Sequence, residues 1–210
     1  MNSNADLIRH LMHVGVLQSP NVIDAFAKID RKDFVTDQSE DEAYFDIALP
    51  IGFDQTISQP TTVAVMLELL DVQTGDSVLD VGSGSGWSTA LLGHLVGDSG
   101  SVLGVEIIPE LVSFGQQNLS KHHNLNATIG QAGEDLGEPG QTFDRILVSA
   151  EARQVPQALI DQLNVGGVMV IPINHSIFKI SKVAENEIEK DEVAGFVFVP
   201  LVENRSTSID

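Results

Sequence analysis

Residues Ser77–Gly86 read SVLDVGSGSG, and this stretch is the strongest single indicator of the fold. The apolar run Val78–Val81 is typical of a buried parallel strand, and the sequence WSTALLGHLV after the glycines predicts a helix. A Cβ in the turn between them would strain backbone positions with positive φ or collide with a ligand lying against the backbone. The stretch therefore predicts a strand, a ligand-binding turn at Gly82, Gly84 and Gly86, and a helix.

An acidic residue, Glu106, follows about 20 residues after Gly86, at the end of a second predicted strand, SVLGVE. A carboxylate at this place can accept hydrogen bonds from both hydroxyls of a ribose. A dinucleotide site has the spacing G-x-G-x-x-G, whereas this turn has G-x-G-x-G and carries Asp80 just before its first glycine. A carboxylate there would repel a pyrophosphate but suits the ammonium group of S-adenosylmethionine. We therefore expect a site for S-adenosylmethionine, with a nicotinamide cofactor as the alternative.

Strands and helices alternate after residue 76, which predicts a mostly parallel α/β sheet with helices on both faces. The expected strands are 77–81, 101–106, 126–130, 143–149 and 167–173, and the expected helices are 86–96, 109–121 and 155–163. The end of the chain differs, because 175–183 and 192–202 are both apolar and are joined by the acidic linker NEIEKDE. We expect these two segments to form an antiparallel pair at one edge of the sheet.

The first 70 residues predict a helical and loop cap on a Rossmann-like core, 71–210, within a single domain of residues 1–210. Apolar spacing predicts helices at 5–17, from Pro20 onward and at 61–70. The acidic stretch 38–42 and the segment 44–60, which has no clear period, are expected to be loops.

The composition limits the possible partners. Among 210 residues, 30 Asp and Glu stand against 11 Lys and Arg, a net charge of −19, and no stretch forms the basic patch that nucleic-acid binding needs. No apolar run reaches the 18 residues of a membrane span, and the N-terminus does not read as a signal peptide. The chain has no cysteine, and its histidines lack metal-ligand spacing. We expect a cytoplasmic monomer without metal, nucleic acid or membrane.

The segment ALPIGFDQTISQPTTVAVMLELL, residues 48–70, resembles the hallmark segment of the protein-L-isoaspartate O-methyltransferase family. VLDVGSGSGWSTALLGHLVG is similar to the cofactor loop of that family, and FDRILVSA, VPQALIDQLNVGGVMVIPI and FVFVPLV match in order and spacing. The resemblance implies a Rossmann-like S-adenosylmethionine-dependent methyltransferase. It also implies protein repair: transfer of a methyl group to the carboxylate of isoaspartyl residues in damaged proteins, which then act as the substrate.

The resemblance also implies roles for individual residues. Ser58 matches the active-site serine, whose hydroxyl can orient the substrate carboxylate, although it could also cap the helix beginning at Pro60. The residues that match cofactor-binding positions or belong to the predicted nucleoside site are Gln55, Thr56, Ile57, Asp80, Gly82, Ser83, Gly84, Gly86, Glu106, Ile107 and Gly133. Trp87 either lines the adenosine pocket or only packs its helix on the sheet.

Two loops depart from the family pattern. In QAGED, residues 131–135, Ala132 replaces the aspartate expected to reach the adenine amino group, a contact that Glu134 or Asp135 could supply instead. In SAEARQVP, Arg153 could bind a substrate carboxylate through two hydrogen bonds, or it could form a surface pair with Glu151. The alternatives are therefore a related methyltransferase that acts on a different carboxylate or acceptor, and a non-catalytic module that binds S-adenosylmethionine.

Overall fold

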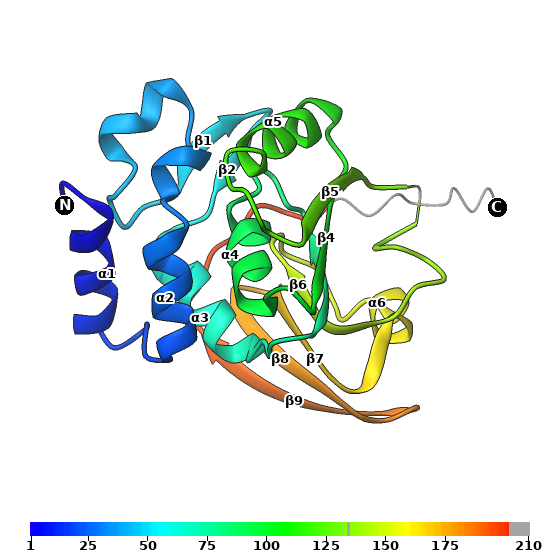
Figure 1. Cartoon of the computed structure of the whole chain (residues 1–210). Helices are drawn as coiled ribbons and strands as arrows, with labels where there is room; N and C mark the ends of the chain where they lie inside the picture. Colours follow the sequence, from blue (N-terminus) through cyan, green and yellow to red (C-terminus); the bar gives the residue numbers. More distant parts are fainter. Residues whose placement is uncertain (134, 202–210) are drawn as a thin grey trace.

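The computed structural model describes residues 1–133 and 135–201 and is built around a seven-stranded sheet (Figure 1). Its strand order is β5-β4-β3-β6-β7-β8-β9, and the pairs from β5 to β7 are parallel. The parallel strands are β3 (Ser77–Val81), β4 (Ser101–Glu106), β5 (Ala127–Gln131), β6 (Phe143–Val148) and β7 (Leu163–Ile173). Short apolar runs form these strands because both faces of the sheet are covered.

The order of the strands reverses at β3. Val81, at the end of this strand, pairs with Val105 of β4 on one side and Val148 of β6 on the other. β4, the next strand along the chain, therefore lies on one side of β3, and β6, a later strand, lies on the other side. In open α/β sheets, ligands bind at the carboxyl ends of the strands where such a reversal occurs. The turn after β3 is thus the expected place for a ligand.

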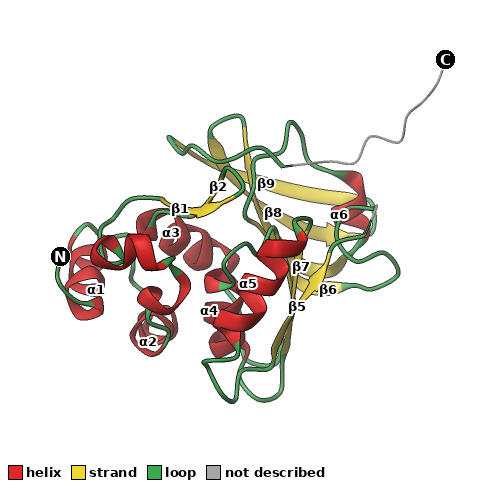
Figure 2. Cartoon of the chain, turned by 90° about the horizontal axis from the view of Figure 1, so that it is seen from above, coloured by secondary structure: helices red, strands yellow, loops and turns green. Residues whose placement is uncertain are grey.

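Helices cover both faces of the sheet, as Figure 2 shows from above. One face carries α3 (Pro60–Leu70), α4 (Trp87–Val96) and α5 (Pro109–Leu119), whose buried side chains pack with Val78 of β3. The neighbouring Leu79 points to the opposite face, where it packs with the short helix α6 (Gln157–Asp161). This alternation of side chains along β3 is the period expected of a strand. The predicted doubly covered, mostly parallel sheet is confirmed.

The N-terminal region packs beside the helices of the first face. It consists of α1 (Asn4–His13), α2 (Pro20–Lys28) and the two 3-10 helices η1 (Arg31–Phe34) and η2 (Asp37–Glu42). The expectation of a plain loop at 38–42 was therefore wrong. Helix α1 also ends before the predicted residue 17, because Gly15 turns the chain with a φ of 78°.

A small β-hairpin occupies part of the segment expected to be a loop. It joins β1 (Leu49–Gly52) to β2 (Gln55–Ile57) as an antiparallel pair outside the main sheet. Phe53 and Asp54 form its two-residue turn, both with positive φ, which is the geometry such tight hairpins require. The prolines and Gly52 hide the alternating pattern in the sequence.

The C-terminal edge is antiparallel, as predicted, but its last strand was placed wrongly. β8 (Ser176–Ala184) pairs with β9 (Glu187–Ala194), so the acidic linker is itself the strand. It can be acidic because nearly all of β9 is exposed. The apolar residues after it do not extend the sheet. They turn back over the carboxyl ends of the strands, where the backbone of Glu151 bonds to Val199 and Leu201, each at 2.8 Å. Residue 202 lies outside the described residues.

Candidate active site

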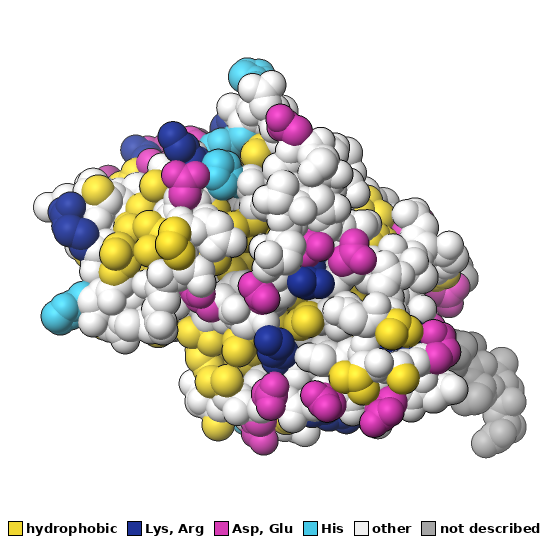
Figure 3. Space-filling model, turned by 60° about the horizontal axis from the view of Figure 1, so that its bottom comes forward, with side chains coloured by type: hydrophobic (Ala, Val, Ile, Leu, Met, Phe, Trp, Pro, Cys, Tyr) yellow, Lys and Arg dark blue, Asp and Glu magenta, His cyan; other side chains and the backbone are white. Residues whose placement is uncertain are grey.

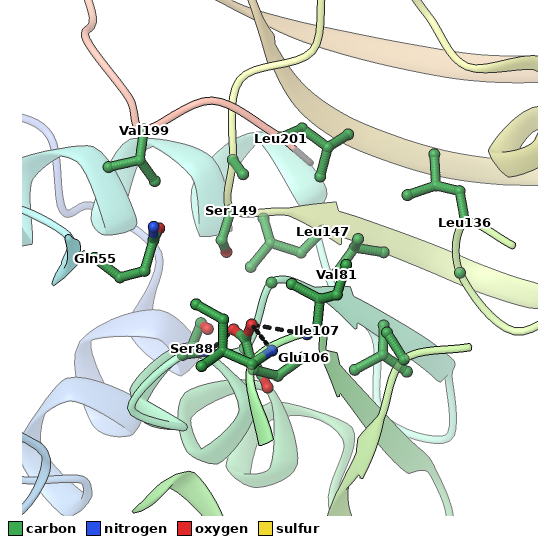
Figure 4. Close-up of a pocket in the computed structure, with 18 of the residues that line it drawn as sticks. Gln55, Val81, Ser88, Glu106, Ile107, Leu136, Leu147, Ser149, Val199 and Leu201 are labelled. Atoms are coloured by element: carbon green, nitrogen blue, oxygen red, sulfur yellow. Dashed lines mark hydrogen bonds between the residues drawn. The ribbon is translucent and has the colours of Figure 1, made fainter. Parts of the chain in front are cut away.

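A cavity of about 390 Å³ lies at the carboxyl ends of β3, β4 and β6. The hairpin β1–β2 and residues 199–201 close it from other sides, so its walls come from segments far apart in the chain. In Figure 4, Gln55 and Val199 lie on one side, while Glu106 and Ile107 lie on another. The volume falls within the range of small-molecule sites.

No helix among the described residues is long and apolar enough to cross a membrane.

Most of the predicted site residues line this cavity. Those that do are Gln55, Thr56, Ile57, Ser58, Gly82, Ser83, Gly84, Glu106, Ile107 and Gly133. Asp80, Gly86 and Arg153 lie outside its wall. The structure therefore brings together residues from the hairpin, from the glycine turn and from the ends of two parallel strands.

The three glycines of the turn have different roles. All three have positive φ, at 82° for Gly82, 49° for Gly84 and 84° for Gly86. Gly82 and Gly84 present backbone to the cavity, whereas Gly86 faces helix α5. A Cβ on Gly86 would lie 2.9 Å from Cδ1 of Ile129 and 3.1 Å from the carbonyl oxygen of Gly115. Gly86 therefore allows the turn and helix α5 to approach each other closely and does not line the cavity.

Glu106 is held rigidly at the cavity wall. Its Oε1 accepts hydrogen bonds from the backbone N–H groups of Ile107 at 2.7 Å and Ile108 at 3.0 Å. Its Oε2 accepts one from Gly84 at 3.0 Å, so the carboxylate links the end of β4 to the glycine turn. Only 7% of the residue is exposed. A buried carboxylate fixed in this way is a pre-oriented acceptor for hydroxyl groups.

Asp80 lies beneath the turn and is fully buried. Its carboxylate accepts hydrogen bonds from Ser88 and Thr89, each at 2.7 Å, and from Ser149 at 3.4 Å. Burial raises the pKa of Asp80, and the hydroxyl donors oppose this shift only in part. Ser88 and Ser149 line the cavity, so Asp80 orders two wall residues from behind. Asp80 itself does not line the cavity, and the contact with a ligand's ammonium group that the sequence led us to expect stays a prediction.

Ser58 is half-buried and lies directly after β2. It does not cap the following helix. Helix α3 begins at Pro60 with Gln59 as its N-cap, and Asp46 satisfies the first turn by accepting hydrogen bonds from the backbone N–H and hydroxyl of Thr61 at 2.8 and 2.7 Å. The capping explanation for Ser58 is therefore wrong, and the serine is part of the cavity wall.

The two loops that depart from the family pattern lie at the cavity in different ways. Ala132 and Asp135 both line it, so a carboxylate is present beside the place where the family's aspartate is missing. Arg153 is exposed and lies off the wall, whereas its neighbour Gln154 lines the cavity. Glu151 does not pair with Arg153; it accepts a hydrogen bond from the backbone N–H of His175 at 2.6 Å.

The charge of the wall is negative or neutral. The described residues that line it include Glu106 and Asp135 but no Lys, Arg or His. The hydroxyl of Ser83, also at the wall, is buried without a hydrogen-bond partner in the described structure. A buried hydroxyl of this kind is normally satisfied, which points to a polar ligand at this spot. The wall is suited to a ligand that carries positive charge and polar groups.

Several residues at or near the cavity were missed from the sequence. Val199–Leu201 were placed in a strand, although Pro200 within the run is a signal against a sheet interior. Trp87 lines the cavity, and its ring packs edge-to-face on Phe26 of helix α2 with ring centroids 5.6 Å apart; its contact with an adenosine stays a prediction. No local signal marked Arg31, which contacts the segment around Ser58 from behind.

The family model for protein-L-isoaspartate(D-aspartate) O-methyltransferase matches residues 2–206 of the chain. A protein-L-isoaspartate O-methyltransferase of Fervidobacterium nodosum is 40% identical over 200 residues, covering 93% of this chain and 99% of the relative. One of Methanopyrus kandleri is 40% identical over 203 residues, covering 93% and 89%. A crystal structure described as a protein-L-isoaspartate O-methyltransferase of Plasmodium falciparum, in complex with S-adenosyl-L-homocysteine, is similar with a TM-score of 0.87 at 27% identity; the match covers 97% of this chain and 100% of that chain.

Proposed function

Because the chain belongs to the protein-L-isoaspartate(D-aspartate) O-methyltransferase family, we propose that it transfers the methyl group of S-adenosylmethionine to the free carboxylate of isoaspartyl residues in damaged proteins. One observation carries the proposal furthest. Ser58, in the middle of the segment that resembles the family's hallmark, and Glu106, the predicted ribose acceptor, line the same cavity although they lie in different parts of the fold.

The residues at the cavity fit S-adenosylmethionine. Glu106 is an oriented acceptor for ribose hydroxyls, and the backbone at Gly82 and Gly84 leaves room beside it. Ser83 has an unsatisfied hydroxyl, and the described wall has no cation to repel a sulfonium or an ammonium group. When bound, S-adenosylmethionine supplies an electrophilic methyl group on a sulfonium. Ala132 contributes no hydrogen bond to the adenine, and Asp135 is the neighbouring group able to accept one.

Ser58 orients the substrate carboxylate by donating a hydrogen bond from its hydroxyl. A carboxylate titrates near pH 4 or below, so the nucleophile is already ionised at neutral pH and needs no general base. The absence of Lys, Arg and His from the described wall agrees with this requirement. Holding two reactants in line can lower a barrier by about 7–11 kcal/mol, so alignment supplies most of the catalysis. Apolar wall residues such as Ile57 and Leu201 limit the access of water.

We infer further that residues 1–70 form a cap and 71–210 a core within one domain, and that the protein is a cytoplasmic monomer. One cluster of buried side chains supports the single domain, because Leu7 and Phe26 of the cap pack in it with Val78 and Leu91 of the core. A net charge of −19 favours a protein that binds neither nucleic acid nor acidic membrane surfaces. Light scattering of the purified protein tests the oligomeric state.

The test of this function is base-labile methyl incorporation into two peptides that differ only in isoaspartate or aspartate at one position. The wild type is expected to label only the isoaspartyl peptide. Ser58→Ala should lower kcat on the order of 10-fold or more, because a hydrogen bond to a charged group contributes about 1.5–3 kcal/mol. Its affinity for S-adenosylmethionine should persist, whereas Glu106→Ala should abolish binding in a calorimetric titration.

Ser113→Ala is the matched control, because this serine is exposed on helix α5 and bonds only to the carbonyl of Pro109. Unchanged turnover in Ser58→Ala would contradict the role of Ser58. Labelling of neither peptide, with S-adenosylmethionine still bound, would favour a different acceptor, a possibility raised by Ala132 and by the exposed Arg153. Failure of the wild type to bind S-adenosylmethionine would contradict the proposed function itself.

A further inference from the structure

A buried arginine, Arg31, lies behind the wall of the cavity. It belongs to the 3-10 helix η1 and is 0% exposed. Its guanidinium lies over the ring of Trp87, 5.3 Å from the ring centroid. Burial lowers the pKa of Arg31 to about 10, so that the side chain still carries its charge at neutral pH. A fully buried cation is costly to keep, and an apolar residue of similar size would fill the same space at less cost.

The hydrogen bonds of Arg31 all go to backbone carbonyls. Nη1 donates to Ala43 at 2.7 Å and to Phe45 at 3.3 Å. Nη2 donates to Ile47 at 2.9 Å and to Ser58 at 3.1 Å. One rigid, planar group therefore fastens the backbone at 43–47 to the backbone of Ser58. The fork geometry of guanidinium makes this possible, whereas the single ammonium of a lysine cannot span the same carbonyls.

A second anchor acts three residues after Ser58, at Thr61. Asp46 lies within the segment that Arg31 fastens, and its carboxylate accepts two hydrogen bonds from Thr61, as described above. Arg31 thus holds the carbonyl of Ser58 itself, and Asp46 holds the backbone N–H and the hydroxyl of Thr61, three residues later. The two anchors restrict the backbone from Ser58, which lines the cavity, to Thr61.

We propose that Arg31, assisted by Asp46, is a positioning residue for methyl transfer: its guanidinium fixes the backbone of Ser58 so that the serine hydroxyl meets the substrate carboxylate in line for reaction. This inference rests on the proposed role of Ser58. Arg31 does not touch the substrate. It acts through Ser58, and an error of about 1 Å in such a position can lower a rate by up to about 100-fold.

The experiment is a double-mutant cycle between Arg31→Lys and Ser58→Ala, with kcat and KM measured on the isoaspartyl peptide. Arg31→Lys keeps the charge but loses the fork, and kcat is expected to fall between about 10- and 100-fold. Affinity for S-adenosylmethionine should change little, because Arg31 donates no hydrogen bond to Glu106 or to the glycine turn. In the Ser58→Ala background, Arg31→Lys should have little further effect on kcat. Two residues that act through one group are not additive.

Lys32→Met is the matched control, because this neighbouring cation is exposed and pairs with Glu40 at 3.1 Å; its kcat should equal that of the wild type. Losses of kcat that multiply in the double variant would overturn the inference and leave Arg31 a structural residue. Unchanged kcat in Arg31→Lys would overturn it as well. Unchanged turnover in Ser58→Ala alone would contradict the proposed function first, so the two failures are distinguishable.

Asp46→Ala keeps the inference testable if Arg31→Lys does not fold. It removes the second anchor and leaves the buried cation in place. Its kcat should fall in the same direction, and this fall should also disappear in the Ser58→Ala background. A kcat equal to that of the wild type in folded Asp46→Ala would overturn the assisted positioning of Ser58.

Discussion

The carboxyl group of Asp80 is fully buried. Burial raises its pKa above the ordinary value near 3.9, so between these two values the folded protein binds a proton that the unfolded chain releases. The contribution of Asp80 to stability is therefore fully present below the ordinary value and is lost as the pH rises through the raised one. Each unit of difference between the two pKa values corresponds to about 1.4 kcal/mol.

We expect Asp80→Asn to remove the loss of stability that the buried charge causes as the pH rises. The free energy of unfolding of the variant minus that of the wild type should grow as the pH rises from below 4 toward neutral, because only the wild type carries the buried charge. Urea unfolding of both proteins over this pH range measures the difference. A difference that stays constant with pH would show that Asp80 keeps the same charge in the folded and unfolded chains.

The sequence identified the residues at this scale whose role follows from a local motif. Glu106 and the turn at Gly82 and Gly84 could be placed because strand, turn and acid follow in a fixed order. The motif gives the position of Asp80 but not the direction of its side chain, so its burial behind the cavity wall could not be predicted. Arg31 could not be found, since its contacts join segments 12 to 27 residues away and appear only when the chain has folded.

At the scale of elements, the approach of helix α5 to the glycine turn determines the shape of the cavity floor. Gly115 lies on the face of α5 that meets this turn. A Cβ on Gly115 would lie 2.9 Å from the carbonyl oxygen of Gly84 and 3.0 Å from Cδ1 of Ile129. The helix therefore packs on backbone and cannot move closer without displacing the turn.

We expect Gly115→Ala to weaken both stability and cofactor binding. Overpacking costs about 1–3 kcal/mol, which exceeds the gain of about 1 kcal/mol from alanine in a helix. The affinity for S-adenosylmethionine should fall several-fold because the turn at Gly84 shifts. Urea unfolding and calorimetric titration measure the two effects. Gly130→Ala is the control, since a Cβ there meets nothing within 4 Å. A variant with unchanged stability and affinity would show that α5 can shift away from the turn without cost.

The elements that could be predicted are those with a strong apolar period. The strands at the centre of the sheet and helices α4 and α5 are close to their expected bounds, because burial requires apolar side chains in them. The hairpin β1–β2 and strand β9 escaped prediction for the opposite reason. Neither is buried on both sides, so hydrogen bonding and turn geometry define them, and their sequences carry little apolar pattern.

At the scale of the whole molecule, the excess of negative charge should select among substrates. Figure 3 shows acidic side chains spread over the lower edge of the face drawn, with few basic ones among them. With a net charge of −19, the protein attracts cationic peptides at long range and repels anionic ones. Such long-range effects are screened beyond about 10 Å at 0.1 M salt.

We expect an isoaspartyl peptide flanked by lysines to have a several-fold higher kcat/KM than one flanked by glutamates at low salt. The ratio should approach one as the salt concentration rises toward about 1 M, where the screening length is about 3 Å. A peptide flanked by glutamines is the control, whose kcat/KM should depend little on salt. A ratio that persists at high salt would indicate a direct contact with the flanking residues.

The exposed edge strand β9 affects how this protein interacts with other extended chains. It is the last strand of the described sheet, and its exposed residues include Glu187, Glu189 and Asp191. An uncharged open edge would invite any extended chain to add itself as a further strand, the first step of aggregation. An enzyme that handles aged and partly unravelled proteins meets such chains constantly. We expect the acidic side chains of β9 to discourage such pairing, so that the enzyme stays apart from aggregates of its substrates.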